Sequence, residues 1–346
     1  MKRIACIIGA RPQFIKHFPL EIELSKAFDL ITIHTGQHYD NNMSEVFFQE
    51  LGIRAPDFKF ELKEKSHGKQ TGEMLSNIED ILLKQEVQGM IVYGDTNSTL
   101  AGALAAAKLN IPIIHIEAGL RSFNKTMPEE LNRVLTDHIS TFLFCSSDVG
   151  MKNLEKEGIK SKVHVTGDLM KDALFLLKDK LKPTRVTPYY LATLHRPYNT
   201  DNPSRLIEIL NNLNQLACQV IFPIHPRTRN ILIECSIDLN QLQNIDFVNP
   251  VGYIEMLSLM KFASKIITDS GGVQKEAYWL QKQCITLRSE TEWIETLKGN
   301  WNTLFFEDLE RLRTIPEPRF GEYNSDLYGN GMAAANIVST LKTYLG

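Results

Sequence analysis

The sequence predicts an α/β protein made of two doubly wound domains, one after the other along the chain. Its 346 residues correspond to about two domains at ~150 residues each. Short apolar runs alternate with amphipathic stretches from end to end, and the runs themselves are apolar throughout. This pattern is typical of parallel strands buried on both faces of a sheet by helices. One polar, proline-containing stretch interrupts the alternation and divides the chain in two.

The first half of the chain is predicted to begin with a buried strand. Residues 4–8 are apolar and follow two basic residues, so the first few residues resemble the start of a signal peptide. Arg11 and Pro12 end this run too early for the apolar region of such a peptide. The predicted strands cover residues 4–8, 30–34, 90–93, 111–117, 142–145 and 163–166, and the predicted helices cover residues 13–27, 43–51, 70–85, 99–108 and 129–140.

The second half repeats this organisation after a linker. Residues 178–188 are polar and basic and contain two prolines, a composition typical of a linker. We therefore predict a first domain over residues 1–177 and a second over residues 189–330. Residues 331–345 form one more helical pattern, and no predicted strand follows it. The predicted strands here cover residues 190–194, 219–224, 246–248, 265–268 and 284–287, and the predicted helices cover residues 203–216, 254–262 and 273–280.

Composition argues against several classes of protein. The chain has 38 basic and 41 acidic side chains, a net charge of −3, so it lacks the basic field of a general nucleic-acid binder. Polar residues and a proline interrupt the most apolar stretch, residues 100–116, short of the ~18 residues that a membrane span needs. The five cysteines are scattered without a C-x-x-C pair, which indicates reduced core thiols in a cytosolic protein.

The clearest candidate ligand site is a Ser-Gly-Gly turn after a buried strand. Ligands of open parallel sheets bind beyond the carboxyl ends of the strands. The turn Ser270-Gly271-Gly272 follows such a strand and opens a helix, where free N–H groups and the helix dipole favour an anion. Glu276, one turn into the helix, is placed to accept hydrogen bonds from sugar hydroxyls. A plain strand-to-helix turn is the alternative.

A second such turn in the first half favours phosphate binding over that alternative. Gly9-Ala10-Arg11-Pro12 lies near Lys16 and also joins a predicted strand to a predicted helix. Neither a Walker A sequence nor G-x-G-x-x-G is present, which argues against a P-loop ATPase or a typical dinucleotide-binding enzyme.

Two carboxylates follow neighbouring strands of the first half. Asp95 ends one strand and precedes a helix, so a catalytic carboxylate and a helix cap are equal alternatives. Glu117 ends a strongly apolar strand, where burial raises the pKa of a carboxyl and suits it to acid or base chemistry. An ion pair of Glu117 with Arg121 or Arg133 is the structural alternative. The helix opened by Pro128 and Glu129 has standard helix-start composition.

Two histidines in the second half share a setting. His195 and His225 each end a predicted strand, and an arginine, Arg196 or Arg227, follows one or two residues later. One such histidine is usually structural, whereas two at adjacent strand ends indicate an anionic ligand. The nine histidines show no H-E-x-x-H pattern, so no metal site is predicted.

Taken together, these motifs resemble the non-hydrolysing UDP-N-acetylglucosamine 2-epimerase family. The resemblance spans nearly the whole chain with family-like spacing. It rests, in order, on Gly9-Ala10-Arg11-Pro12-Gln13, Thr35-Gly36-Gln37-His38, Gly94-Asp95-Thr96, Glu117-Ala118-Gly119-Leu120-Arg121, Pro128-Glu129-Glu130, His225-Pro226-Arg227 and Asp269-Ser270-Gly271-Gly272.

The resemblance implies a glycosyltransferase-B-like fold, with two Rossmann-like domains around a cleft. It implies that residues 331–346 pack back on the first domain and that the second domain binds UDP. The implied reaction inverts C2 of a UDP-2-acetamido sugar without NAD, metal or another cofactor, through loss of UDP, a 2-acetamidoglycal and re-addition of UDP. The implied partners are the UDP-sugar and a second copy of the chain in a homodimer, with no nucleic acid or membrane.

The resemblance also implies roles for individual residues. Asp95, Glu117 and Glu129 correspond to the acid/base carboxylates, and His195 to the catalytic histidine of the second domain. Gln37 and His38 resemble a loop that helps bind a second, activating UDP-sugar. The other predicted contacts to the UDP-sugar are Arg11, Lys16, Arg121, Arg133, His225, Arg227, Tyr253, Ser270, Gly271, Gly272 and Glu276, with Glu276 on the ribose and Tyr253 near the uracil.

Two departures from the family pattern concern the sugar. Tyr198 stands where many relatives carry Glu in an H-R-x-E-N pattern. Thr291-Glu292-Trp293 replaces the T-E-R-P-E usual in enzymes that act on UDP-N-acetylglucosamine, and resembles a branch with members acting on UDP-2,3-diacetamido uronic acids. A hydrolysing 2-epimerase or a UDP-sugar glycosyltransferase on the same fold and, third, a non-catalytic nucleotide-sugar sensor are the alternatives.

Overall fold

The structure is a computed structural model that describes residues 1–37, 47–185, 188–224, 226–235, 239–314 and 316–345. It divides into two compact units, which are described one at a time. The first unit contains Met1–Leu176 and Asp326–Gly346, and the second contains Leu177–Ser325.

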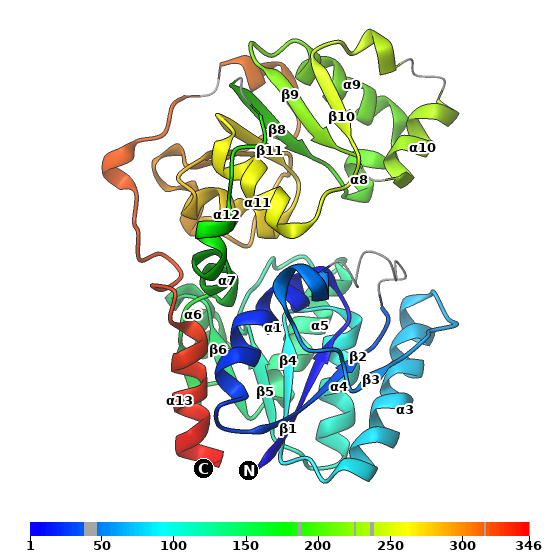
Figure 1. Ribbon diagram of the computed structural model, residues 1–346, viewed down its shortest axis with the longest axis vertical. Helices are drawn as coiled ribbons and strands as arrows, with labels where there is room; N and C mark the ends of the chain where they lie inside the picture. Colours follow the sequence, from blue (N-terminus) through cyan, green and yellow to red (C-terminus); the bar gives the residue numbers. More distant parts are fainter. Residues whose placement is uncertain (38–46, 186–187, 225, 236–238, 315, 346) are drawn as a thin grey trace. The chain divides into compact units, whose positions relative to one another are not determined.

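The first unit is built on a seven-stranded parallel sheet. The strand order is β3-β2-β1-β4-β5-β6-β7, so the chain reverses direction across the sheet between β1 and β4 (Figure 1). The central strands are buried along their whole length, as expected for strands covered on both faces. The strands are β1 (Arg3–Ile8), β2 (Asp29–His34), β3 (Phe58–Lys59), β4 (Gly89–Tyr93), β5 (Ile113–Ile116), β6 (Phe142–Cys145) and β7 (Val163–Val165).

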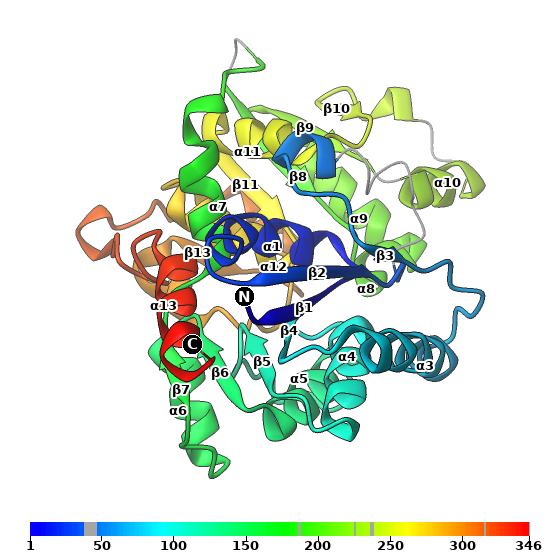
Figure 2. The same cartoon turned by 60° about the horizontal axis from the view of Figure 1, so that its bottom comes forward.

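Helices cover both faces of this sheet. Helices α1 and α13 lie on one face, and α3, α4 and α5 lie on the other (Figure 2). Small residues of α4 let it approach the sheet closely, since a Cβ on Gly102 would lie 2.7 Å from Ile7. The helices are α1 (Arg11–Leu24), α3 (His67–Gln85), α4 (Asn97–Lys108), α5 (Pro128–Ile139), α6 (Asp148–Lys156), α7 (Leu169–Leu177) and α13 (Ala333–Leu345).

The second unit repeats the strand order on a six-stranded parallel sheet. Its order is β10-β9-β8-β11-β12-β13, again with the reversal beside the first strand of the unit. Its core joins α9 residues such as Leu206 and Leu210 to sheet residues such as Phe222. The strands are β8 (Tyr189–Thr193), β9 (Gln219–Pro223), β10 (Ile245–Val248), β11 (Lys265–Thr268), β12 (Gln283–Thr286) and β13 (Asn302–Leu304). The α-helices are α8 (Pro197–Thr200), α9 (Pro203–Asn214), α10 (Pro226–Glu234), α11 (Tyr253–Phe262) and α12 (Gly271–Trp279).

The chain returns to the first unit at its carboxyl end. Helix α13 contacts α1, and its residues Ile337, Val338 and Leu341 are buried. The Asp172 carboxylate on α7 accepts the backbone N–H groups of Ala333 and Ala334 at 3.1 and 2.8 Å. These bonds satisfy amides that open α13 and have no partner within the helix.

Most predicted elements are confirmed within one or two residues. The strands predicted over residues 142–145 and 265–268 coincide with β6 and β11. The helix predicted over residues 43–51 is described from residue 47, since 38–46 lie outside the described residues. The sequence prediction missed β3, β13, α6, α7, α8 and α10.

Candidate active site

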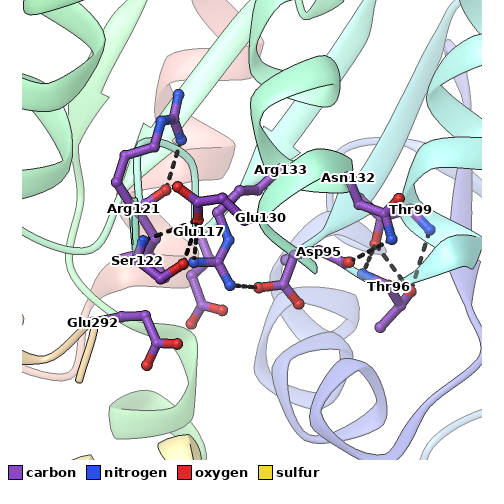
Figure 3. A network of polar contacts seen from close by, with 12 residues as sticks. Asp95, Thr96, Thr99, Glu117, Arg121, Ser122, Glu130, Asn132, Arg133 and Glu292 are labelled. Atoms are coloured by element: carbon purple, nitrogen blue, oxygen red, sulfur yellow. Dashed lines mark hydrogen bonds and ion pairs between the residues drawn. The ribbon is translucent and has the colours of Figure 1, made fainter. Parts of the chain in front are cut away.

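Asp95 and Glu117 follow neighbouring strands of the first unit. Asp95 lies after β4 and Glu117 directly after β5, and these strands pair in parallel. Both residues therefore lie at the carboxyl edge of the sheet. Figure 3 shows Arg133 between the carboxylates of Asp95 and Glu130.

Asp95 forms an ion pair and does not cap the helix that follows. Thr96 is the N-cap of α4, and its hydroxyl accepts the Thr99 N–H at 3.3 Å. The Asp95 carboxylate contacts the Arg133 guanidinium, and 26% of its side chain remains exposed. The helix-cap alternative for Asp95 is therefore wrong, because the capping function belongs to Thr96.

Glu117 is paired with Lys16. The Lys16 ammonium lies 2.6 Å from Glu117 Oε1, and both side chains are more than nine-tenths buried. Glu117 thus forms an ion pair, as the structural alternative expects, but its partner is Lys16, while Arg121 binds Asp137 and Arg133 binds Asp95. Glu117 has a φ of 68°, a left-handed conformation that non-glycine residues adopt at a cost and that is common at functional sites.

The two acidic residues at the start of α5 differ in setting. Glu129 is half-buried. Glu130 is buried and accepts the Ser122 and Phe123 N–H groups, each at 2.9 Å. Its carboxylate also contacts Arg133 at 3.1 Å. Glu130 therefore fixes both the loop before α5 and the arginine that faces Asp95, a function that the sequence analysis did not assign.

Arg121 belongs to a buried charge network. Its guanidinium binds Glu157 through two bonds of 2.7 Å and Asp137 through a third of 2.7 Å. Burial lowers the pKa of a guanidinium, yet these two carboxylates raise the pKa of Arg121 above its ordinary value. Burial would raise the pKa of Asp137, whereas His115 and Arg121 bring it below its ordinary value. Arg121 thus faces carboxylates of its own unit.

The turn at Gly9 differs from the predicted phosphate cradle. The N–H groups of Gly9 and Ala10 both donate to Gln13 Oε1, at 2.7 and 3.1 Å. These two amides are therefore already satisfied within the turn and are not free to bind an anion. A Cβ on Gly9 would lie 2.1 Å from Thr35 Oγ1, so the close packing explains the glycine. Arg11 opens α1 beside Phe47, 5.7 Å from its ring centroid.

Gln37 is tied to the start of α4. Its Oε1 accepts the N–H and hydroxyl of Ser98 at 2.9 and 2.6 Å. His38, predicted with it in a second UDP-sugar loop, lies outside the described residues, as do His225 and the side chain of Arg227.

In the second unit, Asp269 orients His195. Asp269 is fully buried, and its carboxylate accepts the N–H groups of His195 and Arg196 at 3.0–3.2 Å. His195 Nδ1 lies 2.9 Å from Asp269 Oδ1, while half of the histidine side chain is exposed. Burial would raise the pKa of Asp269, but the hydrogen bond and charge of His195 hold it below its ordinary value. The ionised carboxylate favours a hydrogen on Nδ1 and so fixes the orientation of the half-exposed imidazole ring.

The Ser-Gly-Gly turn opens α12 as predicted. Ser270 is the N-cap, and its side chain makes no cap hydrogen bond. Further along α12, Glu276 is buried and accepts the Tyr253 hydroxyl at 2.7 Å. Tyr253 is itself 4% exposed. Its hydroxyl is thus engaged with Glu276, the predicted ribose contact.

The sequence analysis assigned no function to several of these residues. Asp269 was noted only as part of the motif Asp269-Ser270-Gly271-Gly272, and Gln13 only as the last residue of the motif that begins at Gly9. His115 is fully buried, with its ring nitrogens 2.7 Å from Asp137 Oδ1 and 2.8 Å from the Gly94 carbonyl. The position of His115 inside an apolar strand could have indicated a buried histidine that needs polar partners. The part of the chain that the structure describes contains no cluster of three or more residues suited to hold a metal ion.

Comparison with known proteins decides the family. A family model described as UDP-N-acetylglucosamine 2-epimerase matches residues 20–342. The chain belongs to this family. A UDP-N-acetylglucosamine 2-epimerase homolog from Methanococcus maripaludis is 47% identical over 98% of this chain and 99% of the relative. The UDP-2,3-diacetamido-2,3-dideoxy-D-glucuronate 2-epimerase of Pseudomonas aeruginosa is 44% identical over 98% and 99%.

The fold of the family is also confirmed. The crystal structure of Methanocaldococcus jannaschii UDP-GlcNAc 2-epimerase, in complex with UDP-GlcNAc and UDP, superposes with a TM-score of 0.89 at 41% identity, over 99% of each chain. The predicted class, two Rossmann-like domains of the glycosyltransferase-B-like type, is therefore correct. Among the described residues, no helix has both the length and the apolar character of a membrane span.

In this member of the UDP-N-acetylglucosamine 2-epimerase family, the loop after β12 contains Trp293. The Lys275 ammonium of α12 lies 3.7 Å from the Trp293 ring centroid. Glu292 binds Arg288 through two bonds of 3.0 Å. Tyr198 packs its ring edge against Phe306, with centroids 5.8 Å apart.

Proposed function

We propose that this chain inverts C2 of a UDP-2-acetamido sugar by eliminating and re-adding UDP. The observation that carries the proposal is the pair of carboxylates at neighbouring strand ends, each held by its own cation: Glu117 by Lys16 and Asp95 by Arg133. Inversion at an unactivated C2 requires proton removal on one face and proton delivery on the other, which is work for positioned carboxylates.

The proposed reaction balances without an oxidant or water. A carboxylate takes the C2 proton as the C1–O bond breaks, and the bonding electrons leave with the UDP oxygen. The product of this step is a 2-acetamidoglycal with a C1=C2 double bond. Re-addition of UDP to C1, with a proton delivered to the opposite face of C2, gives the epimer. Because negative charge develops on the departing diphosphate, cations and oriented N–H groups stabilise this step.

In the first unit, we assign acid/base chemistry to Asp95, Glu117 and Glu129. Their assignment rests on the resemblance and, for Asp95 and Glu117, on the strand-end geometry. We assign Arg121 to support of this site, because Asp137 and Glu157 engage its guanidinium. We assign Arg133 to hold the Asp95 carboxylate, and the same guanidinium also balances the charge of Glu130.

In the second unit, we assign His195 as a catalytic histidine held by Asp269. The diphosphate contacts proposed here are Ser270, Gly271 and Gly272 at the start of α12, where the helix dipole favours an anion. Glu276 is proposed to bind the ribose, and Tyr253 to orient that carboxylate through its hydroxyl. The remaining proposed contacts to the UDP-sugar are Arg11, Lys16, His225 and Arg227.

The sugar is proposed to be UDP-N-acetylglucosamine or a UDP-2,3-diacetamido uronate. A relative named for each substrate is 44% identical to this chain. The replacement of Arg by Trp293 favours the uronate, since it resembles the branch with members acting on such sugars. Both sugars therefore belong in the test.

Proton NMR in deuterated water tests the proposal. The protein is incubated with each UDP-sugar in turn, and the C2 and anomeric signals are followed. We expect deuterium at C2 of an intact UDP-sugar and the appearance of its C2 epimer. Free UDP together with N-acetylmannosamine would instead indicate a hydrolysing 2-epimerase. Absence of C2 exchange with both sugars would contradict the proposal and favour a transferase or a sensor.

A further inference from the structure

Three successive carbonyls around Asp95 are each held by a buried side-chain N–H. The Tyr93 carbonyl accepts Gln13 Nε2 at 2.9 Å, and the Gly94 carbonyl accepts His115 Nε2 at 2.8 Å. The Asp95 carbonyl accepts Asn132 Nδ2 at 2.9 Å. The donors come from α1, β5 and α5 and are 1%, 0% and 7% exposed. The last residue of β4 and the two residues after it are thus fixed from three separate elements.

The first and third donors are locked by further bonds. Gln13 accepts the Gly9 and Ala10 N–H groups with its oxygen, so its amide orientation is determined. Asn132 also donates to Asn97 Oδ1 at 3.1 Å. Figure 3 shows Asn132 beside the backbone of Asp95, while Arg133 on the same helix reaches its carboxylate.

The second donor, His115, faces an acceptor at each ring nitrogen. The Gly94 carbonyl oxygen, 2.8 Å from Nε2, can only accept, so His115 donates to it through an Nε2 hydrogen. The Asp137 carboxylate lies 2.7 Å from Nδ1 and holds the other edge of the ring. Arg121 binds Asp137 and Glu157 on the far side of this network.

The backbone fixed in this way positions Asp95, one of the proposed acid/base residues. Gly94 has a φ of 63°, and an added Cβ there would lie 3.5 Å from Glu117 Oε1 and 3.8 Å from Lys16 Nζ. A shift of this backbone would move Asp95 relative to both groups. Displacements near 1 Å from productive geometry can cost on the order of 100-fold in rate.

We propose that Gln13, His115 and Asn132 are positioning residues that hold the Tyr93–Gly94–Asp95 backbone in the geometry needed for proton transfer. This inference rests on the proposed function. The three residues act through the backbone of Asp95 and touch no reacting atom, so their removal changes kcat and leaves the affinity for the UDP-sugar close to that of the unaltered protein.

Isosteric variants separate positioning from bulk stability. Gln13→Glu keeps the oxygen that accepts Gly9 and Ala10 but removes the N–H that binds Tyr93, and Asn132→Asp removes the N–H that binds Asp95. The matched control is Asn244→Asp in the second unit, where Nδ2 donates to the Leu216 and Cys218 carbonyls at 2.9 and 3.1 Å. Each change replaces an amide donor to backbone carbonyls by an acid of the same shape.

Two measurements are made on the full chain. The rate of C2 exchange at saturating UDP-sugar is expected to fall roughly 10- to 100-fold in Gln13→Glu and Asn132→Asp, with KM within about threefold. The control is expected to stay within about threefold. Amide hydrogen exchange of residues 94–99, followed by mass spectrometry in the unliganded protein, is expected to accelerate in the two variants and not in the control.

A pH profile adds a readout that simple destabilisation would not give. Below the pKa of the new side chain, the carboxyl of Gln13→Glu carries an O–H that can donate to the Tyr93 carbonyl again. The rate deficit of this variant relative to the unaltered protein is therefore expected to shrink as pH falls. A deficit independent of pH, or a kcat no lower than that of Asn244→Asp, would overturn the inference.

Failure of the inference and failure of the proposed function give different results. If the unaltered protein exchanges no C2 proton with either sugar, the proposed function is wrong. Amide exchange then still decides whether Gln13 and Asn132 hold residues 93–95. Unchanged amide exchange in both variants would show that these side chains do not hold the Tyr93–Gly94–Asp95 backbone, whatever the activity.

Discussion

At the scale of single residues, the first-unit site is made of charges that are paired before any ligand binds. Lys16 lies 2.6 Å from Glu117, and Arg133 contacts Asp95. A buried carboxylate without such a partner would carry a large desolvation penalty. The pairing with Lys16 offsets this penalty for Glu117, which is more than nine-tenths buried at the carboxyl edge of the sheet.

Replacing Glu117 tests its role directly. Glu117→Gln keeps the shape of the side chain but removes the base, so we expect C2 exchange to fall at least roughly 100-fold. UDP binding, measured by calorimetry, should be retained. The control is Glu155→Gln, an exposed position on α6, which should exchange normally. Retained exchange in Glu117→Gln would remove this residue from the mechanism.

His17 makes the stability of the protein depend on pH. It is fully buried between Tyr93 and Thr32, and burial, with a contribution from Arg54, lowers its pKa from 6.5 to about 3. Between these values the unfolded chain binds a proton that the folded chain excludes. The contribution of His17 to the free energy of unfolding should therefore fall as pH decreases below 6.5, by about 2 kcal/mol between pH 7 and pH 5.

His17→Gln removes this titration. Urea unfolding at pH 7, 6 and 5 should show the variant less stable at pH 7, with the difference from the unaltered protein shrinking toward pH 5. A difference that stays constant over this range would contradict the assignment to His17.

At the scale of elements, Asp172 fixes α13 to α7. It accepts the two N–H groups that open the helix, and burial raises its pKa to about 6 despite these bonds. Asp172→Ala should lower the free energy of unfolding by about 1–2 kcal/mol through loss of these bonds. Asp172→Asn, which keeps one acceptor oxygen, should lose less. Urea unfolding at pH 7 measures both, and equal stability of all three proteins would contradict this function of Asp172.

The elements that the sequence predicts well are those whose own residues determine them. The runs at residues 142–145 and 265–268 are apolar on both faces, and they form β6 and β11 as predicted. Strand β3 has two residues and is set by pairing with β2, so its sequence carries no periodic signal. The same limit applies to the site. Asp95 and Glu117 are found at strand ends, whereas Tyr93 and Thr99, which bind the Gln13 amide nitrogen, lie some 80 residues away along the chain.

At the scale of the whole molecule, the second unit is one continuous segment and the first is not. Residues 177–325 form the second unit, while the first also needs residues 326–346. Helix α13 buries apolar residues in the first unit, each worth roughly 1.5–3 kcal/mol when fully buried. The two units should therefore differ in stability when each is produced as a separate fragment.

Two fragments test this difference. Residues 177–325 alone should unfold cooperatively in urea, because the segment contains its whole sheet and core. Residues 1–176 alone should be less stable than the same unit in the full chain and should be cleaved faster by protease. A peptide of residues 326–346 added in excess should restore protection. Equal protease resistance with and without this peptide would show that α13 is dispensable.

The return of α13 also sets an order of events at the ribosome. All residues of the second unit leave the exit tunnel before residue 326 does, so that unit can fold while synthesis continues. The first unit emerges earlier but waits for its last helix, with the face of α1 that α13 contacts still open to water. The part of the chain made first is thus the part completed last, and the nascent protein presents that face to chaperones until its final helix docks.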